Sequence, residues 1–271
     1  MSLPIALQLY SVRDAMEKDF RGTLEKVKEM GYDGVEFAGL FGKSADEVKK
    51  MCEEIGLVPI SAHVPYVKFT GDLDKTVSTY AEIGCKFVVI PYLHLNYCPG
   101  GEDYAEFVEN AKKIGAAANE KGMTLLYHNH DFEFAKKDDK YLLDIMYEDI
   151  SAELIQTELD TCWVNVGGEN PAKYVKKYAG RAPIVHLKDF FGEKADDMYE
   201  LIGEEKKAPA RPNNFEFRPV GAGLQNFPEI LAAVDASSVS WVVVEQDEPS
   251  MGLGSLECAA KSIEYLKSIG Y

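Results

Sequence analysis

The feature that most constrains the fold of this chain is an alternation of short apolar segments with longer segments of helical periodicity. Short apolar runs that end in polar residues are typical of buried strands. The expected strands are 5–10, 34–37, 57–63, 86–91, 122–126 (continuing into Tyr127), 154–160, 183–188 and 240–245. Regular alternation predicts a parallel sheet, and eight units predict a closed (β/α)8 barrel in preference to an open doubly wound sheet.

Helical segments follow these strands. The expected helices are 17–30, 44–55, 73–83, a segment ending at 121, 141–147, 171–178, 227–234 and 256–269. Ser44 and Glu47 predict a capping box at the start of one of them. No G-x-G-x-x-G motif follows the first strand, and no interdomain linker is evident. Residues 1–271 are therefore expected to form a single TIM barrel, with a long active-site loop at about 190–223 that carries a short strand at 215–217.

Composition excludes several classes of partner. The chain carries 29 Lys and Arg against 45 Asp and Glu, a net charge of −16, which disfavours nucleic acid as a partner. No segment approaches the roughly 20 apolar residues that span a bilayer, so no membrane association is expected. The N-terminus lacks the pattern of a signal peptide, and a cytoplasmic location is expected. The five cysteines are scattered and form no C-x-x-C pair.

The ends of the expected strands are unusually polar. In a barrel, the ends of distant strands converge on one pocket, where catalysis takes place. The polar residues at these ends are Gln8, Tyr10, Glu36, His63, His128, His130, Asp160, His186, Lys188, Asp189, Glu245, Gln246 and Asp247. Carboxylates and imidazoles gathered in one pocket would repel one another or remain unpaired unless something bound them.

A divalent cation would satisfy these groups together. The donors are carboxylate oxygens and imidazole nitrogens, and no thiolate is evident among them. This mixture favours Mn²⁺, Co²⁺, Zn²⁺ or Fe²⁺ over Mg²⁺. The sequence therefore predicts one divalent metal ion as the cofactor.

A set of motifs in a fixed order resembles a known family. The motifs are LYSVR (9–13), GVEF (34–37), YHNHDFEF (127–134), LDT (159–161), HLKDF (186–190) and EQD (245–247). They resemble the xylose isomerase-like TIM barrels, and within them the sugar phosphate isomerase/epimerase group that includes the inosose dehydratase-like proteins. The resemblance runs from Leu3 to the C-terminus.

The resemblance implies a single divalent ion held at the ends of the last four barrel strands. Asp160, His186 and Glu245 match three of the family's ligands. His128 stands where many relatives have a glutamate, so the fourth ligand is either His128 or Glu133. Trp163 stands where the endonuclease IV branch has a histidine.

The chemistry that the resemblance implies is proton removal beside a carbonyl, through an enediolate. His128, His130 or Glu133 is expected to act as the base, and Lys188 to stabilise the developing oxyanion or to bind a substrate hydroxyl. The residues expected to bind substrate are Gln8, Arg13, Glu36, His63 and Trp163.

The expected function is that of a metal-dependent isomerase or epimerase acting on a sugar or keto-sugar. The first alternative is a dehydratase or lyase acting on a keto-sugar or inosose. An endonuclease IV-like phosphodiester hydrolase is disfavoured by the net charge and by Trp163. A non-catalytic sugar-binding barrel is the remaining alternative. The expected partner is a small carbohydrate, and the resemblance is compatible with a homo-oligomer.

Overall fold

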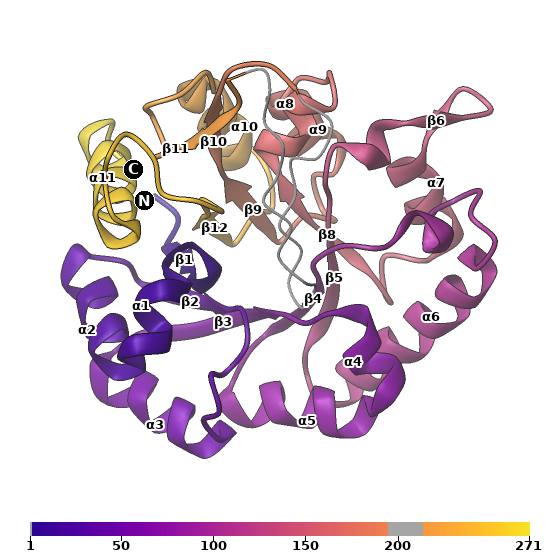
Figure 1. The fold of residues 1–271 in the computed structure, drawn as a ribbon. Helices are drawn as coiled ribbons and strands as arrows, with labels where there is room; N and C mark the ends of the chain where they lie inside the picture. Colours follow the sequence, from indigo (N-terminus) through magenta and orange to yellow (C-terminus); the bar gives the residue numbers. More distant parts are fainter. Residues whose placement is uncertain (1, 195–213) are drawn as a thin grey trace.

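The protein folds into a closed barrel of parallel strands with the helices outside, as the expected alternation predicts (Figure 1). The computed structural model describes residues 2–194 and 214–271. Neighbouring strands follow the order β1-β12-β9-β8-β5-β4-β3-β2, and β2 pairs with β1 to close the barrel. The barrel strands are β1 (Ile5–Gln8), β2 (Gly34–Phe37), β3 (Val58–His63), β4 (Phe87–Ile90), β5 (Thr124–His128), β8 (Gln156–Asp160), β9 (Ile184–Leu187) and β12 (Trp241–Val244). The predicted (β/α)8 fold is confirmed.

Helices connect successive strands and cover the outside of the barrel. They are α1 (Arg13–Lys18), α2 (Phe20–Met30), α3 (Ala45–Ile55), α4 (Tyr66–Gly71), α5 (Leu73–Ile83), α6 (Tyr104–Glu120), α7 (Leu142–Asp149), α8 (Thr161–Val166), α9 (Pro171–Lys177), α10 (Phe227–Asp235) and α11 (Ser255–Ser268). The predicted capping box of Ser44 and Glu47 is present at the start of α3. Among the described residues, no helix is both long and apolar enough to cross a membrane.

The first predicted helix is divided in two. Asp19 has an extended backbone (φ −152°, ψ 91°) and separates α1 from α2. Its side chain accepts a hydrogen bond of 2.9 Å from the backbone N–H of Gly22, which caps the start of α2. The prediction of one helix over 17–30 is therefore wrong, because a capping aspartate begins a new helix within the apolar periodicity.

An apolar layer fills the lower half of the barrel. Its members come from six strands: Ala6, Ile60, Val89, Leu126, Ile184 and Val243. Gly34 of β2 faces the same layer, and a Cβ placed there would lie 2.7 Å from the carbonyl oxygen of Val58. A larger residue at this position would push neighbouring strands apart. The packed layer closes the barrel interior from below and leaves the polar residues above it.

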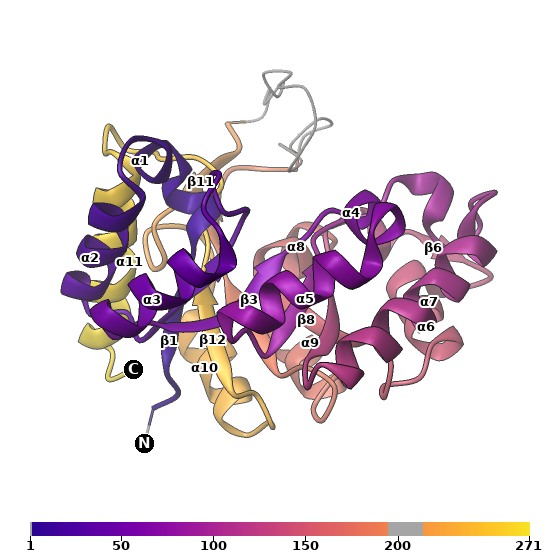
Figure 2. The same ribbon diagram turned by 90° about the horizontal axis from the view of Figure 1, so that it is seen from below.

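A small sheet lies beside the upper end of the barrel. Strand β10 (Asp189–Phe191) pairs antiparallel with β11 (Glu216–Arg218), so the predicted short strand at 215–217 is present, shifted by one residue. The rest of the expected loop, 195–213, lies outside the described residues. The side chain of Asp189 accepts backbone hydrogen bonds from Gly221, Gly223 and Gln225. In Figure 2 the N-terminus and β11 lie toward opposite ends of the barrel.

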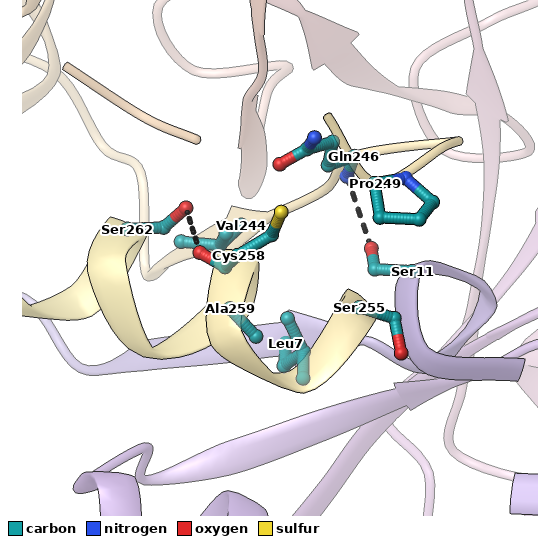
Figure 3. A pocket seen from close by; sticks show the side chains of 9 residues that line it. All are labelled: Leu7, Ser11, Val244, Gln246, Pro249, Ser255, Cys258, Ala259 and Ser262. Atoms are coloured by element: carbon teal, nitrogen blue, oxygen red, sulfur yellow. Dashed lines mark hydrogen bonds between the residues drawn. The ribbon is translucent and has the colours of Figure 1, made fainter. Parts of the chain in front are cut away.

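Helix α11 packs on the outside of the barrel against β1 and β12. A cavity of about 10 Å³, room for roughly one water molecule, remains between them (Figure 3). Beside it, the backbone N–H of Gln246 donates a hydrogen bond of 3.0 Å to Ser11 Oγ. This bond ties the segment after β12, which carries Glu245, to the segment after β1.

Candidate metal centre

The side chains of the site come from barrel positions two residues above the apolar layer. Successive residues of a strand point to opposite faces, so residues two apart share a face. His128 follows Leu126 in this way, and His186 follows Ile184. Across neighbouring strands, Asp160 is paired with His186. The local strand pattern thus turns these side chains into the upper half of the barrel.

Four of these side chains bring their ligand atoms together. His128, Asp160, His186 and Glu245 are all buried, and one ligand atom from each lies within 4.8 Å of the others. His128 Nε2 is 3.4 Å from Asp160 Oδ2 and 3.5 Å from Glu245 Oε2. His186 Nδ1 is 3.1 Å from Glu245 Oε2. We call these four residues the upper cluster.

The upper cluster leaves buried polar atoms without hydrogen bonds. Both ring nitrogens of His128 and Oδ2 of Asp160 are buried and have no hydrogen-bond partner. Buried polar atoms without partners cost free energy, so each one calls for an explanation. Ligand bonds of about 2.0–2.2 Å to a divalent ion would satisfy Nε2 of His128 and Oδ2 of Asp160 together. The donor set therefore fits one divalent ion.

The orientation of Asp160 has a local cause. It is the N-cap of α8, and its Oδ1 accepts a hydrogen bond of 2.9 Å from the backbone N–H of Trp163. The cap fixes the carboxylate and leaves Oδ2 facing His128. The short helix α8, which the sequence did not predict, is thus part of what positions a candidate ligand.

A second set of polar residues, the lower network, lies beside the upper cluster. It consists of Gln8, Glu36, Ser61, His63 and Glu158. His63 Nε2 lies 2.6 Å from Glu158 Oε2 and 3.2 Å from Glu36 Oε1. Gln8 Nε2 donates to Glu36 at 2.7 Å, and Ser61 Oγ donates to it at 2.5 Å. Gln8, Glu36 and His63 were expected to bind substrate, but the structure places them in this buried hydrogen-bonded network.

Glu158 is a functional candidate that sequence reasoning missed. It lies two residues before Asp160 on β8 and therefore points into the barrel. The period-two rule applied to β8 would have found it. Together with His63, His128 and His186 it forms a second candidate ligand set. However, its contact of 2.6 Å with His63 is already a hydrogen bond, whereas the contacts of His128 in the upper cluster are not.

Lys188 is buried beside the upper cluster and bridges three carboxylates. Its Nζ lies 2.6 Å from Asp247 Oδ1, 3.0 Å from Glu245 Oε2 and 3.9 Å from Asp160 Oδ2. Burial alone would lower the pKa of Lys188, but these carboxylates outweigh burial and raise it above its ordinary value. Lys188 is therefore a fixed cation and not a base. The structure adds Asp247 to the site as its nearest partner.

The charged groups around the upper cluster shift the pKa values of its histidines and carboxylates. Burial lowers the pKa of His128, but the neighbouring carboxylates of Asp160 and Glu245 outweigh it and raise the pKa to about 9. Burial would raise the pKa of Glu245, but Lys188 and His186 hold it well below its ordinary value. The upper cluster therefore favours the binding of a positive charge. Without a metal ion, that charge is a proton on His128.

His130 lies at the edge of the cluster. Its ring stacks on Phe132, with centroids 5.5 Å apart, and lies 5.3 Å from the ring of Trp163. Its ring is also 5.2 Å from that of His128. Burial, together with the charges of His128 and Lys188, lowers its pKa well below the ordinary value. His130 is therefore a neutral imidazole next to the candidate ligands.

Glu133 does not join the upper cluster. Its carboxylate accepts hydrogen bonds from the hydroxyl of Tyr127 and from the backbone N–H of His130 (2.8 Å). Tyr127 precedes His128 on β5 and therefore points to the opposite face of the strand. Burial raises the pKa of Glu133 to about 7. Of the two alternatives for the fourth ligand, the structure brings His128 to the other three and holds Glu133 elsewhere.

Two other expected substrate-binding residues have structural contacts. Trp163 is fully buried and packs against Phe215 and Phe217. The Arg13 guanidinium lies 4.0 Å from the ring centroid of Tyr10 and donates to the backbone carbonyls of Tyr10 and Asp247. Arg13 thereby links the segments after β1 and β12.

A closed parallel barrel with a histidine and carboxylate cluster at its strand ends defines a class of (β/α)8 proteins with a candidate metal site. The family model described as "Xylose isomerase-like TIM barrel" matches residues 24–269, and the chain belongs to this family. The resemblance inferred from the motifs is therefore confirmed.

Individual relatives are distant but match along nearly the whole chain. The inosose dehydratase of Clostridium beijerinckii is 24% identical and is matched over 93% of this chain and 90% of its own length. A crystal structure of a sugar phosphate isomerase/epimerase from Parabacteroides distasonis superposes with a TM-score of 0.78 at 21% identity, covering 100% of this chain and 95% of its own. The IolI protein, solved with a zinc atom, superposes with a TM-score of 0.69 at 14% identity, and 98% of each chain is covered.

Proposed function

We propose that this protein is a divalent-metal-dependent isomerase or epimerase that acts on a sugar or keto-sugar. The observation that carries the proposal is the convergence of the four upper-cluster side chains beside the fixed cation of Lys188, with His128 and Asp160 Oδ2 lacking hydrogen bonds. The isomerase/epimerase among the structural relatives supports the reaction class.

His128 Nε2, Asp160 Oδ2, His186 Nδ1 and Glu245 Oε2 would hold the ion. The bound ion would act as a Lewis acid toward the substrate carbonyl and its neighbouring hydroxyl. The two imidazoles and two carboxylates together balance the charge of a divalent ion. This donor set favours Zn²⁺, Co²⁺, Mn²⁺ or Fe²⁺ over Mg²⁺. The zinc atom in a structural relative is consistent with this preference.

His130 is the proposed base. Among the three expected bases, His128 lies in the ligand cluster and Glu133 is hydrogen-bonded to Tyr127. His130 is neutral and lies beside the cluster, so it can accept a proton from the carbon next to the carbonyl. Lys188 cannot accept a proton, but its charge would stabilise the enediolate that results. Return of the proton from His130 to the neighbouring carbon gives the isomer, whereas the epimer requires a second proton donor on the opposite face of the first carbon.

A dehydratase is the second candidate function. The same enediolate loses a β-hydroxyl as water when an acid protonates that group, which His130 could do after taking the first proton. The observation that favours this reaction is the set of curated relatives named inosose dehydratase, matched over 93% of this chain. A keto-inositol would then be the substrate.

The test begins with the metal. Protein purified without chelator should contain about one ion per chain, and His186→Ala should lose it. His94→Ala is the matched control, because His94 is exposed and is the one histidine of the five outside the site. Wild-type protein that takes up no divalent ion would overturn the proposal.

The second stage measures the proton step. The loaded enzyme is incubated in D₂O with keto-sugars and with inososes, and exchange of the α-proton is followed by NMR. Deuterium in an epimer or isomer supports the first function. Loss of water from the product supports the dehydratase. Exchange in none of these compounds by a fully loaded enzyme would count against both.

A further inference from the structure

The lower network contacts the candidate metal ligand His186, and the shortest polar contact is with Glu36. His186 Nε2 lies 2.9 Å from Glu36 Oε1. Its other nitrogen, Nδ1, lies 3.1 Å from Glu245 Oε2 in the upper cluster. The two nitrogens of this fully buried ring thus face two different groups of carboxylates.

A neutral imidazole carries one proton, and the nitrogen that holds it cannot bind a metal ion. If the proton is on Nδ1, His186 has no lone pair to offer to the upper cluster. If the proton is on Nε2, Nδ1 is free to act as a ligand. The choice of tautomer therefore decides whether the upper cluster has four ligands or three.

We infer that Glu36 is a positioning residue, which accepts the Nε2–H of His186 and so presents Nδ1 to the ion. The inference rests on the metal centre proposed above. Metal-bound histidines commonly donate their second N–H to a carboxylate, which fixes the tautomer and the ring orientation. Glu36 makes no contact with the ion in this arrangement, and its role is different from the substrate binding expected from the sequence.

The carboxylate of Glu36 is itself held in place. Its Oε1 accepts a hydrogen bond from Gln8 Nε2 and its Oε2 accepts one from Ser61 Oγ. Gln8 and Ser61 lie on β1 and β3, on either side of β2, so the barrel strands themselves fix the acceptor. Glu36 is fully buried, which makes an unpaired carboxylate costly and keeps these bonds formed.

A stacking contact on one face of the His186 ring also fixes its position. The ring of His63 stacks parallel to that of His186, with centroids 5.4 Å apart and planes at 5°. His63 is in turn bound to Glu158 at 2.6 Å, and Glu158 Oε2 lies 3.2 Å from His186 Nε2. A 180° flip of the His186 ring would put Cε1 in the place of Nε2 and so break the bond to Glu36.

The test compares three variants with wild type. Glu36→Met removes the nearer acceptor at similar volume and leaves Glu158 at 3.2 Å, whereas Glu36→Gln keeps an amide oxygen that can accept the Nε2–H. Ser61→Ala is the matched control, because it removes a buried hydrogen bond to the same carboxylate on the oxygen that does not face His186. Thermal unfolding of each metal-free protein reports loss of fold separately.

Two readouts are needed. Competition with a chromophoric chelator gives the affinity for Zn²⁺ alone, and long-range ¹H–¹⁵N NMR of the zinc-loaded protein identifies which nitrogen of His186 carries the proton. We expect Nε2–H in wild type, Zn²⁺ binding roughly 10- to 100-fold weaker in Glu36→Met, and a smaller loss in Glu36→Gln. Ser61→Ala should weaken Zn²⁺ binding far less than Glu36→Met, because Gln8 still donates to the oxygen that faces His186.

The inference and the proposed function fail in different ways. Wild-type protein that takes up no Zn²⁺ overturns the proposed function. Wild-type protein that binds Zn²⁺ with His186 protonated on Nδ1 overturns the role of Glu36. If Glu36→Met fails to fold, Glu36→Gln decides through NMR, because Nδ1–H in that variant contradicts an acceptor role. Equal losses in Glu36→Met and Ser61→Ala would show that Glu36 serves only the fold.

Discussion

The backbone N–H of Trp163 donates a hydrogen bond of 2.9 Å to Oδ1 of Asp160, so the two oxygens of this carboxylate have different roles. Oδ1 caps the N-terminus of helix α8, and Oδ2 faces the upper cluster without a hydrogen-bond partner. A single residue thus joins a helix cap to the candidate metal site.

Because the two oxygens of Asp160 have different roles, we expect different outcomes for two substitutions of this residue. Asp160→Asn keeps an oxygen that can cap α8 but replaces the ligand oxygen by an amide group, so it should lose the ion and keep its fold. Asp160→Ala should lose the ion and also about 1 kcal/mol of stability from the cap. Metal analysis and denaturant unfolding of the metal-free proteins measure the two effects. Full metal content in Asp160→Asn would remove Asp160 from the ligand set.

Metal affinity should rise with pH. Because the pKa of His128 in the metal-free protein is about 9, the ion must displace a proton from this ring at neutral pH. The affinity for Zn²⁺ should therefore increase by at least roughly tenfold per pH unit between pH 6 and pH 8. Chelator competition across this range gives the slope. In His128→Gln the binding should be weaker and the slope smaller by about one proton, and an unchanged slope would contradict the assignment of His128.

Glu133 should influence stability and not metal content. Its pKa is raised by burial to about 7 in the folded protein, from an ordinary value near 4.5. Between these values the folded state holds a proton that the unfolded state has lost, so stability falls as pH rises through this window. The loss attributable to Glu133 should be about 3 kcal/mol by pH 7.

The Glu133→Gln variant tests this sign directly. It should lose less stability than wild type when the pH is raised from 4.5 to 7, as measured by urea unfolding of the metal-free proteins. Its metal content should match that of wild type, because its carboxylate lies outside the upper cluster. Loss of the ion in this variant would restore Glu133 as the fourth ligand.

Lys188 should matter for turnover more than for metal binding. Lys188→Met removes the cation next to the proposed enediolate, and the rate of α-proton exchange should fall by roughly 10²- to 10³-fold. Stability should also fall, because the buried carboxylate of Asp247 loses its partner at 2.6 Å. Lys177→Met is the charge-matched control, since Lys177 pairs with Asp144 at the surface. Exchange at the wild-type rate in Lys188→Met would leave the lysine with a structural role only.

The fold was predictable because its signals are local. Apolar runs of strand length, helical periodicity and caps such as Ser44 with Glu47 each depend on residues close together in the chain. The one wrong helix, over 17–30, arose because Asp19 interrupts the backbone without interrupting the apolar pattern. Strand alternation also predicted polar side chains at or next to the ends of β5, β8 and β9, where His128, Asp160 and His186 lie.

The sequence by itself therefore determined the barrel and the residue types at its strand ends. Only the tertiary structure decided which of them meet. Glu36 and His186 are 150 residues apart in the chain, and their contact exists because closure of the barrel sets the distance between strands. Glu133 lies beyond the end of β5, where the period-two rule no longer gives the direction of a side chain, and its hydrogen bonds to Tyr127 and His130 turn it away from the cluster. The local sequence pattern determines which side chains of each strand point into the barrel, whereas contacts between distant strands depend on the packing of the whole barrel.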